Sequence, residues 1–162
     1  MVLRLVGSEM CIRDSWYGAR ALLSMRLEKG WGVWTMEYRP DFNAVESGMD
    51  VFINWKKDFV GKEATLKALN EGVSQKLVTM VIDTNGIDVA HDEAILKDGV
   101  PVGYVSSGGY AHHVGKSMAM GYVAAEFAAA GTTLQVEILG NFYDAEVLAG
   151  PIYDGNGVNM RS

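Results

Sequence analysis

The 162-residue sequence is 49% hydrophobic and 21% charged, as expected of a globular protein with a core rather than of a disordered chain. Its net charge of −6 and isoelectric point near 5.0 argue against a broad nucleic-acid surface, and no apolar run approaches the roughly 18–20 residues that span a bilayer. The single cysteine, Cys11, excludes an internal disulfide framework and a cysteine-based zinc site. We therefore expect a soluble, cytoplasmic protein with neither nucleic-acid nor membrane partners.

The first fifteen residues differ from the rest of the chain. Residues 5–15, LVGSEMCIRDS, resemble the translation of an adapter and transposon-end sequence used in sequencing libraries. We therefore expect residues 1–15 to be an artefact outside the fold, with Trp16 in the interior of a longer natural chain. The alternative is a genuine N-terminal strand, VLRLV. The remainder of the chain keeps the net charge of −6, because two arginines balance two acidic residues within this stretch.

Two helices are predicted before the middle of the chain. Residues 16–29 place one apolar stripe at helical spacing, leave three basic residues off it, and end at Gly30. The stripe consists of Ala19, Leu22, Leu23 and Leu27, and the basic residues are Arg20, Arg26 and Lys29. Residues 61–71 form the second predicted helix, capped by Gly72.

Between these helices the sequence is aromatic, and after them its periodicity changes. Pro40 favours an extended backbone at Arg39, and residues 51–55, VFINW, read as a buried strand. Helical spacing stops at residues 72–74 and alternation begins there, which predicts a domain boundary.

Six strands are predicted downstream, at residues 76–83, 93–96, 100–105, 118–123, 134–138 and 143–148. The Asp98-Gly99 pair predicts a tight hairpin turn between the second and third strands. Leu134, Val136 and Ile138 alternate with polar residues, as in a strand with one wet face. This pattern predicts a small antiparallel barrel or sandwich. Residues 106–116 read as a Ser/Gly/His loop inside a hairpin.

The loop histidines do not form a metal site in this interpretation. Adjacent residues of a strand point to opposite faces, so His112 and His113 do not readily ligate one metal ion. His91 is the only other histidine, and no zinc-type spacing accompanies it. We expect no metal site and interpret His112 and His113 as loop residues that line a pocket or an interface.

Other motifs are weak. The run from Ser106 to Gly109 lacks the P-loop pattern, and no GxGxxG or GxSxG sequence occurs. Asp41 and the Asp92-Glu93 pair fit solvated turns better than a catalytic carboxylate pair. The tryptophans at 31, 34 and 55 could stack on a flat ring, but an aromatic core is the preferred interpretation.

Three segments, in the same order, resemble the aminomethyltransferase family, the glycine-cleavage T-protein and its relatives. They are SMRLEKGWGVW (residues 24–34), ESGMDVFINWKKDFVGKEA (46–64) and GYVSSGGYAHHVGKSMAMGYV (103–123). The family usually has Ala at Ser47 and Thr at Ser106, both mild departures. Lys29, the GYAHHVGKS loop and the ending PIYDGNGVNMRS are most similar to the branch formed by the C-terminal regions of flavin-dependent dimethylglycine and sarcosine dehydrogenases.

The resemblance implies a fold and a division of labour. It implies an α+β remnant of a folate-binding domain at residues 16–72, followed by a small antiparallel β-barrel domain of about six strands at residues 74–162. Tetrahydrofolate is the implied cofactor and small-molecule partner. FAD would lie only in the missing N-terminal domains, which would also be partners of this segment within the parent chain.

The functional residues implied by the resemblance are few. No catalytic residue of the family falls within this chain, so we expect the fragment to be inactive alone and to bind folate weakly at most. An arginine that contacts folate in free-standing T-proteins is replaced by Leu22; Arg20 and, near the C-terminus, Arg161 are the remaining candidates for the folate glutamate tail. Both could equally be ordinary surface charges. Two alternative interpretations of the chain stay open. It could be the end of a free-standing aminomethyltransferase or folate-dependent demethylase, or it could be a non-catalytic folate-binding or structural module.

Overall fold

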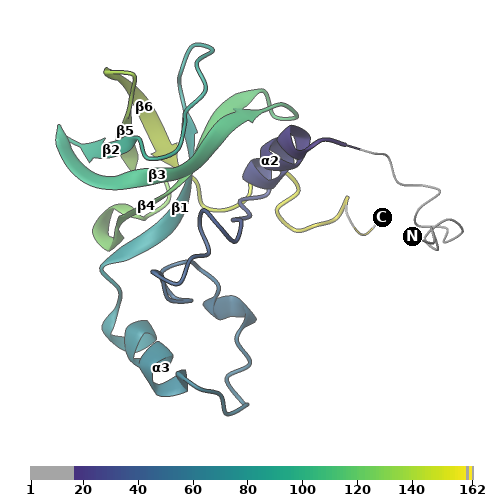
Figure 1. Cartoon of the computed structure of the whole chain (residues 1–162), viewed down its shortest axis with the longest axis vertical. Coiled ribbons are helices and arrows are strands. Elements are labelled where there is room, and N and C mark those ends of the chain that lie inside the picture. Colours follow the sequence, from purple (N-terminus) through teal and green to yellow (C-terminus); the bar gives the residue numbers. More distant parts are fainter. Residues whose placement is uncertain (1–16, 160, 162) are drawn as a thin grey trace, which may run out of the picture.

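The computed structural model describes residues 17–159 and 161 (Figure 1). A six-stranded antiparallel β-barrel forms the main body, helix α2 lies against it, and helix α3 projects away from it. The expectations for residues 1–15, including the alternative strand VLRLV and the lone Cys11, fall outside the described residues. In the described part of the chain, no helix has the length and apolar character required to cross a lipid bilayer.

The barrel closes in the order β1-β4-β3-β2-β5-β6, with β6 pairing back to β1. Every pairing is antiparallel, and the structure thereby decides for a barrel rather than a sandwich. The strands are β1 (Gln75–Ile82), β2 (Ala94–Lys97), β3 (Val100–Ala111), β4 (Lys116–Ala124), β5 (Thr133–Ile138) and β6 (Asn141–Val147). All six predicted strands are therefore present, with differences at their ends.

The barrel core follows the alternation in the sequence. In β5, Leu134, Val136 and Ile138 are all at most 1% exposed, while the residues between them are partly solvated. The predicted turn at Asp98-Gly99 is also confirmed, because both residues have positive φ angles, 52° and 78°, as a type I′ hairpin turn requires. The apolar side chains of all six strands thus meet in one closed core.

The predicted loop at residues 106–116 is wrong in extent. Strand β3 continues to Ala111 and β4 already starts at Lys116, so only residues 112–115 form the turn. A register shift between Val105 and Ser107 marks a β-bulge at Ser106, and both serines are buried. Gly108, one of the glycines that suggested a loop, allows close packing instead, because a Cβ atom there would collide with Val89.

Helix α2 (Ala19–Glu28) confirms the first predicted helix, but it faces the barrel with an unexpected side. Its buried residues are Ser24, Arg26, Leu27 and Glu28, whereas Leu22 and Leu23 of the predicted apolar stripe are 47% and 37% exposed. Placing Arg26 off the buried face was therefore wrong. Ser24 and Glu28 bond to the β3–β4 hairpin and Arg26 bonds to Glu37, which offsets part of the cost of burying these polar side chains.

The predicted strand at residues 51–55 is also wrong. The segment contains a single turn of 3-10 helix, η1 (Asp50–Phe52), in which Val51 and Phe52 are 75% and 65% exposed. A strand needs a neighbour for its backbone groups, and no described strand pairs with this segment. The second predicted helix is confirmed as α3 (Lys62–Glu71), none of whose residues is buried.

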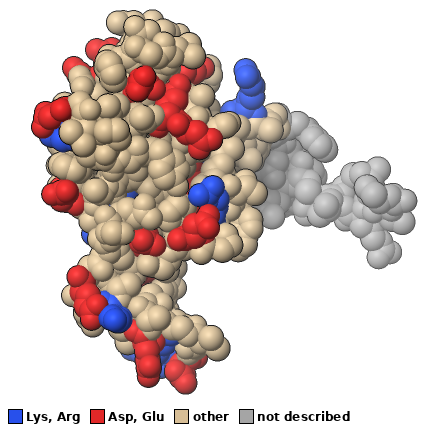
Figure 2. All heavy atoms as spheres, turned by 60° about the vertical axis from the view of Figure 1, so that its left-hand side comes forward, with Lys and Arg blue, Asp and Glu red and all other residues tan. Residues whose placement is uncertain are grey.

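Charge differs between the two parts of the chain. Residues 75–159 hold ten Asp and Glu against three Lys, whereas residues 17–74 hold eight of each sign. In the view of Figure 2, acidic side chains are scattered over the barrel, and both signs lie side by side at the end that carries α3. The predicted domain division at residues 72–74 coincides with this change of composition and stays a prediction.

Candidate functional site

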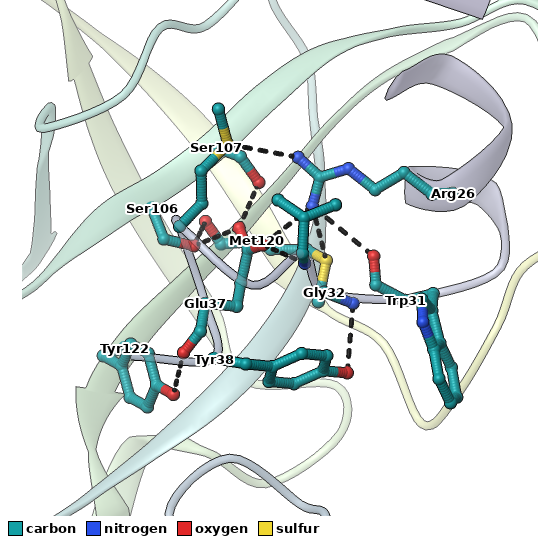
Figure 3. A network of polar contacts seen from close by, with 11 residues as sticks. Arg26, Trp31, Gly32, Glu37, Tyr38, Ser106, Ser107, Met120 and Tyr122 are labelled. Carbon is teal, nitrogen blue, oxygen red and sulfur yellow. Dashed lines mark hydrogen bonds and ion pairs between the residues drawn. The ribbon is translucent and has the colours of Figure 1, made fainter. Parts of the chain in front are cut away.

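A buried polar network joins residues 17–74, here called the N-terminal segment, to the barrel, and Glu37 is at the centre of this network (Figure 3). The Glu37 side chain is 0% exposed. Its Oε2 accepts hydrogen bonds from Arg26 Nη1 at 2.9 Å and from the Val33 backbone N–H at 2.8 Å. Its Oε1 accepts from the hydroxyl groups of Ser106, at 2.7 Å, and Ser107. Four donors from three separate segments therefore converge on one carboxylate.

The network continues through backbone groups on both sides of Glu37. Tyr122 Oη on β4 donates to the Glu37 carbonyl at 2.9 Å, and the Gly32 N–H donates to Tyr38 Oη at 3.1 Å. Burial, opposed by that Gly32 hydrogen bond, raises the pKa of Tyr38 above its ordinary value. Burial likewise raises the pKa of Tyr122, so both phenols are neutral donors or acceptors at physiological pH.

An aromatic hollow of about 500 Å³ lies next to this network. Its wall is formed by Trp31, Gly32, Trp34, Tyr38, Arg39, Pro40, Phe42, Ala44, Ser47 and Met49. Trp31 and Trp34 are 49% and 79% exposed, so the preferred interpretation of these two residues as aromatic core is wrong. Trp31 meets Tyr38 edge-on with ring centroids 6.4 Å apart, and Phe42 stacks on Tyr122 at 3.7 Å. The hollow therefore offers flat apolar faces at the surface.

The two predicted folate residues lie apart from this hollow. Arg20 is exposed and lines a second hollow, of about 280 Å³, between α2, β3 and the segment around Asp88. The guanidinium of Arg161 lies beside Gly157 in the C-terminal segment. Leu22, at the position where the resemblance implies an arginine, is exposed. Nothing in these positions brings Arg20 and Arg161 together on one ligand, and their role stays a prediction.

The paired histidines attach the β3–β4 hairpin to helix α2 through their backbones. The His112 N–H donates to Ser24 Oγ at 3.1 Å, and the His113 N–H donates to Glu28 Oε1 at 2.7 Å. His112 also lines the hollow that contains Arg20. Across residues 17–159 and 161, no three His, Cys, Asp or Glu side chains are grouped closely enough to hold a metal ion.

The C-terminal segment is fastened to the end of α2. Lys29 Nζ donates to the carbonyl of Asp154 and, at 3.3 Å, to its Oδ2. The His113 ring meets the Tyr153 ring edge-on at 4.3 Å, beside a third hollow of about 420 Å³. Desolvation alone would raise the pKa of Asp154, but hydrogen bonds from the Asn159 N–H, Lys29 and the Val158 N–H hold it below its ordinary value.

Sequence reasoning missed the central pair of the buried network. Arg26 was placed off the buried face, and Glu37 carried no motif. The one available signal was a single acidic residue between Trp34, Met36 and Tyr38, an apolar setting in which a carboxylate needs a partner. The identity of that partner depends on the bulge at Ser106, which is not visible in the sequence.

Three comparisons with known proteins agree with this architecture. The glycine cleavage T-protein C-terminal barrel domain matches residues 75–154. Mitochondrial dimethylglycine dehydrogenase of Mus musculus is 34% identical over 148 residues, covering 90% of this chain and 17% of that protein. An aminomethyltransferase of Desulfitobacterium hafniense (strain DSM 10664 / DCB-2) is 32% identical over 153 residues, covering 94% of this chain and 41% of that protein.

A solved structure extends the likeness beyond the barrel. The glycine cleavage system aminomethyltransferase T from Bartonella henselae superposes with a TM-score of 0.80 at 25% identity, over 87% of this chain and 40% of that one. The chain thus spans less than half the length of each of these proteins. It carries a glycine cleavage T-protein C-terminal barrel domain and is homologous to dimethylglycine dehydrogenases and aminomethyltransferases.

Proposed function

We propose that this chain is the C-terminal, tetrahydrofolate-binding part of a demethylating flavoenzyme similar to dimethylglycine or sarcosine dehydrogenase. The observation that carries the proposal is the extent of the match to the mouse dehydrogenase. That match covers 90% of the chain, so it includes the segment with the aromatic hollow as well as the barrel at residues 75–154. The parent would oxidise the amine on FAD in another domain and transfer the one-carbon unit to tetrahydrofolate here.

The surface of the N-terminal segment suits such a ligand. Folate combines flat rings with a carboxylate tail. The exposed faces of Trp31 and Trp34 could stack on a flat ring, and an arginine presents a fork of donors to a carboxylate. Arg20 and Arg161, which lie in different parts of the structure, are the alternative proposed partners of that tail. General acid–base chemistry needs a positioned proton donor or acceptor beside the substrate, and the resemblance places that group outside this chain.

A free-standing aminomethyltransferase is the second candidate for the parent. Its support is the match of 32% identity over 94% of the chain to the Desulfitobacterium protein, together with the superposition on the Bartonella structure. In this case the parent would lack the flavin domain. For either candidate we propose a cytoplasmic location of the parent protein. Fractionation of the source cells against a mitochondrial or membrane marker would test this location.

Resequencing of the source DNA upstream of the Trp16 codon separates the two candidates. An open frame that runs back into a GxGxxG strand–helix unit supports the flavoenzyme. A frame of the size of the Desulfitobacterium protein, of which this chain matches 41%, supports the transferase. Genomic codons for residues 5–15 would contradict the artefact prediction.

Calorimetry with tetrahydrofolate tests the ligand. We expect the chain to bind weakly, and Arg20→Gln to weaken binding further by several-fold because a charge-assisted hydrogen bond is lost. The matched control is Lys67→Gln, since Lys67 is 71% exposed on α3. Micromolar binding by the chain alone would contradict the expected weak affinity, and equal effects of both variants would remove Arg20 from the site.

A further inference from the structure

We propose that Glu37 is a positioning residue through which the barrel sets the shape of the aromatic hollow and its affinity for a planar aromatic ligand. The inference rests on the proposed function only for the identity of that ligand. Glu37 does not itself line the hollow; the adjacent Tyr38 does. A carboxylate inside the protein thus controls a surface next to it.

The first step is the attachment of Glu37 to the barrel. Ser106 and Ser107 on β3 both bond to Oε1, and Tyr122 on β4 bonds to the Glu37 carbonyl. These two strands are hydrogen-bonded neighbours in the closed sheet. Side chain and main chain of Glu37 are thus held from adjacent strands, and the bulge at Ser106 lets two consecutive serines reach the same oxygen.

The second step leads from Glu37 to the wall of the hollow. The Val33 N–H bonds to Glu37 Oε2, and the backbone N–H groups of Met36, Glu37 and Tyr38 all bond to the Val33 carbonyl at 3.1–3.2 Å. This makes residues 33–38 one closed turn around the carboxylate. Gly32 is packed tightly inside it, since a Cβ atom there would lie 2.8 Å from the side chains of Glu37 and Tyr38.

The third step is the contribution of Arg26 on helix α2. Its Nη1 bonds to Glu37 Oε2 at 2.9 Å and reaches the Trp31 carbonyl at 3.4 Å. Trp31 and Tyr38, the two rings that meet edge-on in the wall, are therefore both tied to the Arg26–Glu37 pair. Arg26 Nε is buried without a hydrogen-bond partner. The guanidinium thus depends on Glu37 for its compensating charge, and a neutral residue at 37 would free Arg26 to move.

The test measures ligand affinity through a signal from the wall of the hollow. Tetrahydrofolate is titrated into the 15N-labelled chain while the indole N–H signal of Trp31 is followed, which reports weak binding as well as strong. Glu37→Gln keeps the shape of the side chain and removes its charge. We expect its dissociation constant to rise by about tenfold, the effect of losing one hydrogen bond to a charged group.

The matched control is Glu28→Gln. Glu28 is also buried, at 3% exposure, and also accepts a backbone N–H, but it lies beside the third hollow and not the aromatic one. We expect its dissociation constant to equal that of the unmodified chain. Should Glu37→Gln fail to fold, Tyr122→Phe removes only the hydroxyl that holds the Glu37 carbonyl, and we expect a several-fold loss of affinity.

The possible results either support or overturn the positioning role of Glu37. A lower melting temperature of Glu37→Gln with an unchanged dissociation constant would overturn the positioning role, as would an equal loss in Glu28→Gln. If tetrahydrofolate does not bind the unmodified chain, the titration is repeated with 1-anilinonaphthalene-8-sulfonate, an anion that carries a planar naphthalene ring. Binding of that probe with the same dependence on Glu37 supports the inference while the proposed folate function fails. Absence of binding by both probes overturns the inference.

Discussion

The barrel and the N-terminal segment are stabilised by different kinds of contact. The barrel buries apolar side chains from all six strands in one closed core. In the described segment from 17 to 74, Leu27 is the one buried large apolar residue, whereas Ser24, Arg26, Glu28 and Glu37 are buried polar residues. Burial of apolar surface is non-directional, but a buried polar group is stable only with specific partners. The segment therefore depends on the barrel for its structure.

The exposed apolar residues reinforce this contrast. Large apolar side chains more than a third exposed are concentrated in the N-terminal segment, and they include Tyr17, Leu22, Leu23, Met25, Trp31, Trp34, Val51, Phe52, Phe59, Val60 and Leu69. Fewer such residues lie on the barrel, among them Val100, Leu139 and Phe142. Contiguous exposed apolar surface favours contact with other molecules or with itself. We therefore expect association of the chain to involve the N-terminal segment rather than the barrel.

The largest effect is expected from a cavity in the barrel. Leu134→Ala removes a side chain that is 1% exposed and should lower the free energy of unfolding by about 4 kcal/mol. Urea denaturation followed by circular dichroism measures this. The control in the next turn of the chain is Leu139→Ala, where the side chain is 86% exposed and the expected change is below about 0.5 kcal/mol. Similar losses for both variants would contradict a single apolar core.

A smaller loss is expected when the polar attachment of the segment is broken. Arg26→Met leaves the Glu37 carboxylate buried without its counter-charge, and the free energy of unfolding should fall by about 3 kcal/mol. This decrease in the free energy of unfolding is at the low end of the range for a broken buried ion pair, because Ser106, Ser107 and Val33 still donate hydrogen bonds to Glu37.

The control for Arg26→Met is a substitution in the exposed ion pair between Lys67 and Glu71 on α3. Lys67 Nζ lies 3.9 Å from Glu71 Oε2, and both side chains are more than 60% exposed. Lys67→Met should therefore change the free energy of unfolding by less than about 0.5 kcal/mol. Hydrogen exchange sharpens the result: in Arg26→Met the amides of residues 32–38 should exchange faster, while those of β5 and β6 should not. Uniform acceleration in both regions would show that the segment and the barrel unfold as one unit.

The smallest effect is expected at the C-terminal attachment and should depend on pH. The pKa of Asp154 lies below its ordinary value of 3.8 in the folded protein. Its contribution to stability is therefore present above about pH 4 and is lost as the pH falls through the lower folded-state pKa. The melting temperature of Asp154→Asn should be lower than that of the unmodified chain at about pH 6, and the difference should shrink below about pH 4.

The control for this pH dependence is Asp41→Asn, since Asp41 is 66% exposed in its pair with Arg39. It should leave the melting temperature unchanged over the same range. A difference for Asp154→Asn that stays constant between about pH 6 and pH 3 would mean that the carboxylate charge is not what fastens residues 153–159 to α2.

Sequence patterns were sufficient where the determining interactions are local. The alternation in β5, the Asp98-Gly99 turn and helix α3 all follow from backbone preferences and from the period of apolar residues, which act over a few positions. The resemblance to aminomethyltransferases, now confirmed for the barrel at residues 75–154, rests likewise on short runs of sequence.

The errors share one cause, which is dependence on distant partners. Residues 51–55 have the composition of a strand, but the described chain provides no strand beside them. Residues 106–111 look like a loop, yet pairing with β4 makes them strand, and Gly108 allows the close approach of Val89. In each case the backbone state is decided by what lies alongside in space.

The sequence by itself thus determined a six-stranded β domain preceded by helical and aromatic segments, because apolar periodicity and turn chemistry are local properties. Only the tertiary structure decided that Arg26 and Glu37 form the buried junction between those parts, and that Trp31 and Trp34 face outward from it. A buried charge is tolerated only where partners converge on it, and convergence of α2, the 33–38 turn and β3 on the Glu37 carboxylate is a property of the folded chain alone.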